Sequence, residues 1–186
     1  MNRTTSTALH PLLQARWSPT SFDPDDVLAE AETASLLEAA RWAPSAGNSQ
    51  PWAFIVARRG DADHRRLVPH LARSAAPWAA TASLLVANLA HRYVEDTDWD
   101  YSEFSAYDLG QAVAHMSIQA GALGLHVRQF RAFDRAAIAE EFGVPGHWEV
   151  TTMSAVGRAA GSPRASRSRK AAAELRWPSG GSAIRE

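Results

Sequence analysis

The chain has 186 residues, a formal net charge of −1 at pH 7 and no cysteine. Its length predicts one domain that buries about 70% of the surface of the unfolded chain. The lack of cysteine excludes disulfides, thiolate metal sites and thiol catalysis, and fits a reducing cytoplasm. The near-neutral charge argues against nucleic acid or an acidic membrane surface as a partner. We find neither a signal peptide nor an apolar stretch that could span a bilayer, so we expect a cytoplasmic protein.

The first part of the chain predicts two helices. Residues 8–16 form a short first helix. Asp23 and Pro24 are a helix start signal, because they place an N-cap residue before proline at the first helical position. Apolar residues then recur at helical spacing. We expect this second helix to break near Thr33 and to end at Ala43, before a proline.

The rest of the chain alternates strands with helices. Strands are predicted at residues 53–58, 83–88, 127–130 and 150–156. Helices are predicted at residues 61–72, 105–123 and 135–142, with a short turn at Pro77. Helices dominate, so the fold class is α+β with one small sheet. We see no repeat and no second domain, and we treat residues 1–186 as one domain whose tail, 160–186, is basic.

One connection, residues 95–103, is unusually acidic. It holds five acidic residues together with Trp99 and Tyr101. Such a segment is typical of a solvated loop, and the alternative is a lid over a site.

The most informative motif is Ala43-Pro44-Ser45-Ala46-Gly47-Asn48-Ser49-Gln50-Pro51-Trp52. Two prolines bracket a small, polar turn that contains glycine. A predicted helix leads into this turn and a predicted strand leaves it. Backbone N–H groups and two side-chain amides are therefore brought into one tight bend. Such a bend suits a planar ligand rich in heteroatoms.

This motif resembles the FMN-dependent nitroreductase family, which carries Pro-Ser-x-x-Asn-x-Gln-Pro-Trp here. The matching residues are Pro44, Ser45, Asn48, Gln50, Pro51 and Trp52. The family also has Arg-x-Ser-x-Arg-x-Phe after its first helix. Here this element reads Arg16-Trp17-Ser18-Pro19-Thr20-Ser21-Phe22, with Thr20 in place of the second arginine.

Later elements extend the resemblance over about residues 9–176. The family's Ala-Leu-Gly-Leu stands at residues 122–125. A branch of the family has His-Gln-Met before Gly-Phe-Asp, and here Gln129 and the Phe-Asp pair are kept while the His and the Gly are not. The family's basic Lys/Arg-x-Arg after the last strand is matched by Arg167-Ser168-Arg169.

The resemblance implies an interlocked α+β homodimer with two FMN molecules in its interface. NAD(P)H would deliver a hydride to flavin N5, and a nitroaromatic, quinone or related small-molecule acceptor would then take the electrons in a ping-pong mechanism. Flavin does this chemistry, so no catalytic side chain is required. Seven tryptophans agree with core and interface packing, or with one or two residues that border a flat cofactor.

The expected phosphate ligands are Arg16 and Ser18, with Arg167 and Arg169 from the tail. Arginine suits phosphate because its planar fork donates two hydrogen bonds at once. Thr20 brings a hydroxyl but no charge, so we expect weaker retention of FMN than with arginine.

The remaining expected ligands surround the flavin ring. Pro44, Ser45 and Ala46 would pack against it from the partner subunit. Asn48 either contacts the flavin or supports the loop, and Trp52 is interpreted as a core residue. By position in the motifs, Trp17 and Gln129 are also cofactor-binding candidates. Arg131 either raises the flavin potential or points to solvent.

Several alternatives stay open. The scaffold also suits a flavin-dependent dehydrogenase, a flavin-consuming enzyme, or a flavin-binding protein without turnover. Nucleic-acid binding by the tail is the weakest hypothesis. Phe104, Tyr107 and Trp99 are candidate walls of a substrate pocket, while His115 and His126 are interpreted as structural. The natural acceptor and the choice between NADH and NADPH are not determined.

Overall fold

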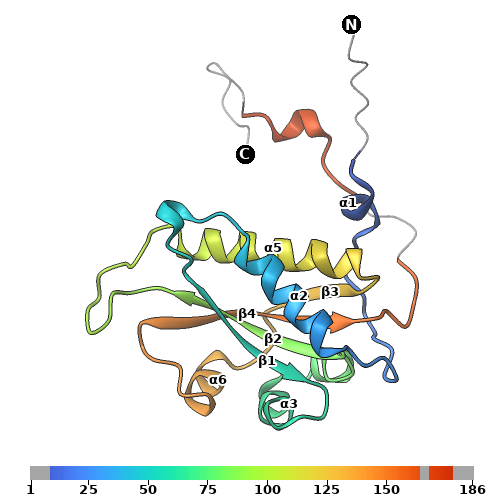
Figure 1. The fold of residues 1–186 in the computed structure, drawn as a ribbon, viewed down its shortest axis with the longest axis horizontal. Coiled ribbons are helices and arrows are strands. Elements are labelled where there is room, and N and C mark those ends of the chain that lie inside the picture. Colours follow the sequence, from blue (N-terminus) through green and yellow to red (C-terminus); the bar gives the residue numbers. More distant parts are fainter. Residues whose placement is uncertain (1–8, 164–167, 178–186) are drawn as a thin grey trace, which may run out of the picture.

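A four-stranded antiparallel sheet organises the chain in a computed structural model that describes residues 9–163 and 168–177 (Figure 1). The strand order is β1-β2-β4-β3. The bounds are Trp52–Arg58 for β1, Leu84–His91 for β2, His126–Phe130 for β3 and Trp148–Gly157 for β4. The sheet confirms the predicted α+β class, and its two inner strands run longer than the sequence predicted.

Strand β2 carries the core because both of its faces are covered. Leu84 and Val86 point to one face, and Leu85 and Ala87 to the other, as the two-residue period of a strand requires. All four side chains are buried. This explains why the predicted strand is a continuous apolar run rather than an alternating one.

Helices cover the two faces separately (Figure 1). One face packs against α2 (Glu30–Arg41) and α5 (Ser105–Ala122). The other face packs against α3 (Ala62–Leu67), α4 (Ala76–Ala79) and α6 (Arg135–Glu141). A short α1 (Pro11–Ala15) lies before the first strand, and three 3₁₀ turns complete the described elements: η1 (Ala46–Asn48), η2 (Val68–His70) and η3 (Ala172–Leu175).

The predicted start of the second helix is wrong. The helix begins at Glu30 and runs through Thr33 without a break. Asp23 instead accepts a hydrogen bond from the N–H of Asp25 and forms a turn. The Asp26 carboxylate accepts from Ser83 Oγ at 2.8 Å and from the backbone N–H of Arg158 at 3.1 Å. These contacts fasten the segment to the sheet, so it is not available to form a helix.

The helix predicted for residues 61–72 is split. It is α-helical only to Leu67 and continues as the 3₁₀ turn η2. Pro69 explains the change, because proline has no N–H for the helical ladder. Asp61 caps the helix, and its carboxylate accepts from the N–H of His64 at 2.7 Å. Gly124, with φ of 73°, ends α5 in the left-handed conformation that glycine favours.

Within the described residues, every helix falls short of the combined length and apolar character that crossing a bilayer demands.

Candidate functional site

The loop of residues 44–50 has an unusual backbone. Gly47, Asn48 and Gln50 have φ values of 58°, 56° and 47°. Left-handed backbone is easy for glycine, but asparagine and glutamine pay a conformational cost there. Such a conformation persists only where surrounding contacts determine it, and it is common at ligand sites.

Side chains within and beyond the loop supply those contacts. Ser45 Oγ accepts from the N–H of Gln50 at 3.0 Å, and a serine that accepts in this way keeps its own O–H as a donor. The N–H of Ala46 donates to Asp108 Oδ2 at 3.0 Å. Gln111 Nε2 donates to Asp108 Oδ1 at 3.1 Å and to the carbonyl of Pro44 at 3.4 Å. The loop is therefore fastened to the first two turns of α5.

The segment of residues 16–22 lies at the other end of α5. A cavity of about 410 Å³ opens between this segment, α5 and β3. Its lining brings together three predicted ligands, Arg16, Ser18 and Gln129, with Leu13, Ala114, Ser117, Ile118 and Val127. Gln129 Nε2 also donates to Ser117 Oγ at 3.4 Å. Residues that carry a guanidinium, hydroxyls and an amide thus line one cavity.

Side chains on the far face of the sheet fix this segment. Arg128 donates to the carbonyl of Pro19 at 3.1 Å, and its guanidinium lies 4.4 Å from the centre of the Trp78 ring. Phe22 is buried and pairs with Ala159 in an isolated antiparallel bridge. Because Pro19 and Phe22 are held, the second half of the segment is fixed, and Arg16 and Ser18 directly precede it.

A smaller cavity of about 140 Å³ lies beside the first, and Arg16, Trp17 and His126 are part of its lining. Trp17 meets His126 edge to face, with ring centres 5.2 Å apart. Burial, and after it the positive charge of Arg158, lowers the pKa of His126. His126 is therefore neutral near pH 7, which agrees with the structural role predicted for it.

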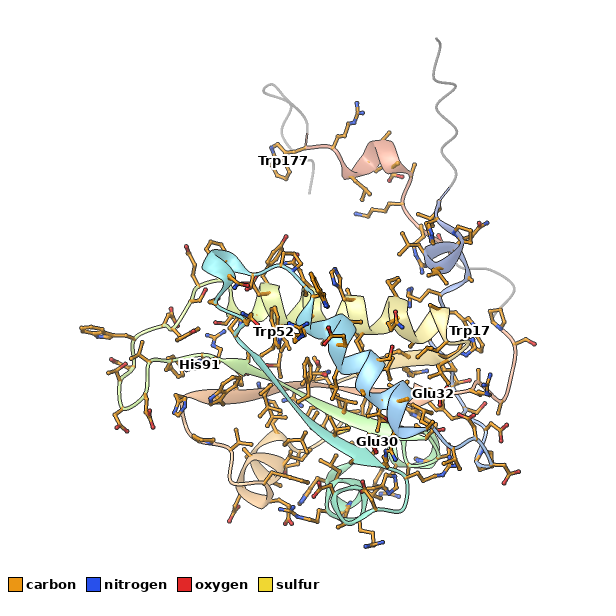
Figure 2. All side chains as sticks on the ribbon, in the orientation of Figure 1. Trp17, Glu30, Glu32, Trp52, His91 and Trp177 are labelled. Atoms are coloured by element: carbon orange, nitrogen blue, oxygen red, sulfur yellow. The ribbon has the colours of Figure 1, made fainter. Side chains whose placement is uncertain are left out.

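The two groups of predicted ligands do not meet in one chain. The 410 Å³ cavity takes no residue from the 44–50 loop. Figure 2 shows Trp52, which follows the loop, under the N-terminal half of α5, and Trp17 beside its C-terminal end. Within one chain, the two groups therefore lie at opposite ends of α5.

Other predicted ligands lie elsewhere. Arg131 lines a separate open cavity with His70 and donates to the carbonyl of Phe133 at 3.1 Å. Thr20 is exposed, next to the buried Pro19. Arg169 is exposed on the tail and donates to the carbonyl of Ser168. Arg167 lies outside the described residues.

The acidic connection is exposed, as predicted, and Trp99 has 73% of its surface accessible. Its last part is nevertheless anchored beside the 44–50 loop. The Tyr101 ring stacks on His91 with centres 3.8 Å apart, and its hydroxyl donates to the carbonyl of Ser49 at 3.4 Å. Phe104 and Tyr107, the other candidate walls, are 46% and 69% exposed. These aromatic side chains are accessible to a ligand or to a partner.

Sequence reasoning missed the residues that hold both segments. Asp108 is only 1% exposed and Gln111 is half-buried, and the sequence pattern marks both only as members of an amphipathic helix. One signal was available, because Asp108 lies next to Leu109 in the stripe that faces the sheet, where an unpaired carboxylate is costly. Arg128 gave no comparable signal, since arginine in a short edge strand is ordinary.

The chain is an α+β protein with a cavity between α5, β3 and residues 16–22, and sequence comparison identifies its class. The chain matches the Nitroreductase family over residues 13–77 and 69–158. This protein therefore belongs to the nitroreductase family. A Streptomyces coelicolor protein with the provisional name NADH dehydrogenase/NAD(P)H nitroreductase is 30% identical over 157 residues, which cover 75% of this chain and 77% of the relative.

Solved structures agree on the fold. A crystal structure described as an oxidoreductase containing FMN is 29% identical, has a TM-score of 0.77, and is matched over 86% of this chain and 81% of its own. A nitroreductase-like protein from Streptococcus mutans is 23% identical, with a TM-score of 0.76 and coverage of 90% and 96%. The second likeness concerns the fold alone.

Proposed function

We propose that this protein is an FMN-dependent oxidoreductase that uses NAD(P)H to reduce a nitroaromatic, quinone or related acceptor. The observation that carries the proposal is the cavity in which Arg16, Ser18 and Gln129 come together. Family membership and the FMN in a similar crystal structure support it.

The residues of the cavity fit the phosphate end of FMN. Arginine can bind a phosphate with two parallel hydrogen bonds, and a serine hydroxyl adds one more. Arg16 and Ser18 supply these groups along one wall. Arg169, and Arg167 in the part of the tail that is not described, would add charge from the tail. Thr20 contributes no charge, so we expect this phosphate site to be weaker than one with arginine at that position.

The loop at the other end of α5 fits the flavin ring. Pro44 and Ala46 are exposed and offer flat apolar contact, and Ser45 keeps a hydroxyl donor. Since the N–H of Ala46 already donates to Asp108, we expect Ala46 to pack against the ring rather than to hydrogen-bond it. Asn48 has an exposed side chain that can either contact the flavin or support the turn.

A homodimer would bring the two groups together, and α5 offers the surface. Its open face carries Tyr107, Gly110, Ala114, Ile118 and Gly121. Apart from His115 and the phenol of Tyr107, the one ionisable side chain in this helix of 18 residues is the buried Asp108. A solvated helix face is normally charged, whereas an uncharged face with small residues suits close packing against a partner.

Further apolar side chains border that face. Trp42 at the end of α2 is 71% exposed, and Leu9 and Leu13 near α1 are 54% and 47% exposed. The tail from residue 168 to Trp177 rises away from the body above α5, with Trp177 79% exposed (Figures 1 and 2). We infer one domain over residues 1–186, two copies of which share two FMN sites.

The chemistry that FMN supplies when bound is transfer of a hydride from NAD(P)H through its N5 to the acceptor, in two half-reactions that use the same space. The protein's own residues would bind and orient the cofactor. Arg16 and Ser18 hold the phosphate end, and residues 44–46 of the partner subunit would set the position of the ring. Tyr107 and Phe104 would exclude water from the face of the ring and bound the acceptor pocket.

An absorbance spectrum tests the proposal. Purified protein is mixed with FMN, and NADPH or NADH is then added without oxygen. Flavin bands that bleach on addition of either nucleotide are the expected result. Flavin that binds and does not bleach would contradict a reductase and favour a flavin-binding protein. A protein that binds no flavin would overturn the proposal.

A further inference from the structure

One carboxylate holds the 44–50 loop from outside it. Asp108 lies in the first turn of α5 and is 1% exposed. One of its oxygens accepts from the N–H of Ala46 at 3.0 Å, and the other accepts from Gln111 Nε2 at 3.1 Å. Gln111 in turn donates to the carbonyl of Pro44. Asp108 and Gln111 thus contact the first and third residues of the loop.

Among the described residues, Asp108 forms no ion pair, and every ion pair involves another acid. A buried carboxylate without a cation is expensive unless N–H groups surround it. Here the amide of Gln111, the N–H of Ala46 and the N-terminal turn of a long helix supply favourable dipoles. The N–H of Ala46 therefore helps to stabilise the buried carboxylate, and the same hydrogen bond fixes the position of Ala46.

The loop needs such an anchor. Three of its residues, Gly47, Asn48 and Gln50, have left-handed backbone, and two of these are not glycine. Local bonds, such as that from the N–H of Asn48 to the carbonyl of Ser45 at 3.0 Å, shape the turn but do not place it relative to α5. The bond from Ala46 to Asp108 does, because α5 is part of the packed core.

We propose that Asp108 is a positioning residue, which holds the 44–50 loop on α5 in the conformation that receives the flavin ring. The role in flavin binding rests on the proposed function, whereas the hydrogen bonds that hold the loop do not depend on it. Asp108 is enclosed and its two oxygens are engaged within the chain, so it acts through Ala46 and Pro44 and does not touch the ligand.

The first test needs no flavin. Amide hydrogen exchange of peptides covering residues 44–50 and 16–22 is compared in the wild type and in Asp108→Asn. Exchange over 44–50 is expected to rise about tenfold, while exchange over 16–22 stays unchanged, because a neutral amide is a weaker acceptor than a carboxylate. Equal exchange over 44–50 in both proteins would overturn the proposal, and so would an equal rise in both segments.

The second test is FMN affinity, measured by quenching of flavin fluorescence at a temperature where each variant is folded. Asp108→Asn is expected to weaken FMN about tenfold. The matched control is Asp61→Asn, because Asp61 also accepts backbone N–H groups, but at α3 on the opposite face of the sheet. This control should lose stability and keep FMN affinity within about twofold.

The outcomes separate the two proposals. If wild-type protein binds no FMN, the proposed function fails, and the exchange result still decides the role of Asp108. If Asp108→Asn does not fold, Gln111→Ala replaces it, since this half-buried residue makes the second link to the loop. Gln111→Ala should raise exchange over 44–50 about threefold and weaken FMN in the same direction. If both effects are absent in a folded variant, Asp108 is not a positioning residue.

Discussion

The two segments that present the proposed flavin ligands are held in opposite ways. Residues 16–22 are fixed by a cation, since Arg128 donates to the carbonyl of Pro19, and by a bridge between Phe22 and Ala159. Residues 44–50 are fixed by an anion, since Asp108 accepts from the N–H of Ala46. The first segment has no regular structure apart from the bridge at Phe22, whereas the second is a tight turn with left-handed residues.

The difference matches what each segment would bind. The first carries a charged ligand, Arg16, and needs little more than a rigid edge from which to present it. The second offers backbone and small side chains, so its own conformation is the recognition element. Changes of charge should therefore dominate at the first segment, and changes of backbone preference at the second.

The largest expected effect is at Arg16. Arg16→Gln keeps a polar side chain and removes the charge, so FMN should bind about 30-fold more weakly. Titration of flavin fluorescence measures this. Arg73→Gln, an exposed arginine before α4 on the opposite face, is the control and should change nothing. Equal FMN affinity of the wild type and Arg16→Gln would contradict the assignment of the phosphate site to this segment.

A gain is expected at Thr20. Thr20→Arg restores the charge that the family motif has here, and FMN should bind about fivefold more tightly at low salt, with the gain shrinking as salt is added. Dissociation constants at two ionic strengths measure it. Thr20→Gln, which adds length without charge, should give no gain. A wild type that holds flavin as tightly as Thr20→Arg would show that the missing charge costs nothing.

Lowering the pH should reduce the free energy of unfolding through His126, which lines a cavity with Arg16 and Trp17. Burial and Arg158 lower the pKa of His126, so below about pH 6.5 the unfolded chain binds this proton more readily than the folded one. The stability from His126 is therefore complete above that pH and declines as pH falls through the lowered pKa. His64 and His91 shift in the same direction. Urea unfolding at pH 7.5 and 5.5 should show a loss for the wild type and a smaller loss for His126→Phe, and identical losses would contradict this.

The smallest effect is expected at Asn48, and it decides whether this residue contacts the flavin or supports the loop. Glycine adopts φ of 56° without strain, so Asn48→Gly should change the free energy of unfolding by less than about 0.5 kcal/mol. If FMN affinity also stays constant, Asn48 supports the loop. If affinity falls while stability does not, Asn48 contacts the flavin. Asn48→Ala is the contrast and should cost about 1 kcal/mol through the strained backbone.

Sequence predicted the local elements of the fold better than the long-range contacts that hold them. The strands and the left-handed Gly124 follow from local residue chemistry, and the α+β class follows from the order of the elements. The helix predicted from Asp23 was wrong because Asp26 is drawn to Ser83 and Arg158, which lie 57 and 132 residues away.

The residues that hold the two segments, Asp108 and Arg128, could not be predicted for the same reason. Asp108 lies 62 residues from Ala46 and Arg128 lies 109 residues from Pro19. Local periodicity predicts that a residue faces the core, but it does not predict which distant backbone group that residue contacts. A motif shared with a family likewise shows what is presented to a ligand and not what holds it in place.

The central claim is that each FMN site takes residues 16–22 from one copy and residues 44–50 from the other. Mixed dimers of two variants test it directly. Arg16→Gln impairs the first segment, and Gly47→Val impairs the second, because valine is strained at φ of 58°. In the mixed dimer one site carries both defects and the other carries none. The account predicts one tightly bound FMN per mixed dimer, although neither variant alone retains it. A mixed dimer with no tight site would show that both segments of one chain serve the same flavin, and would contradict the account.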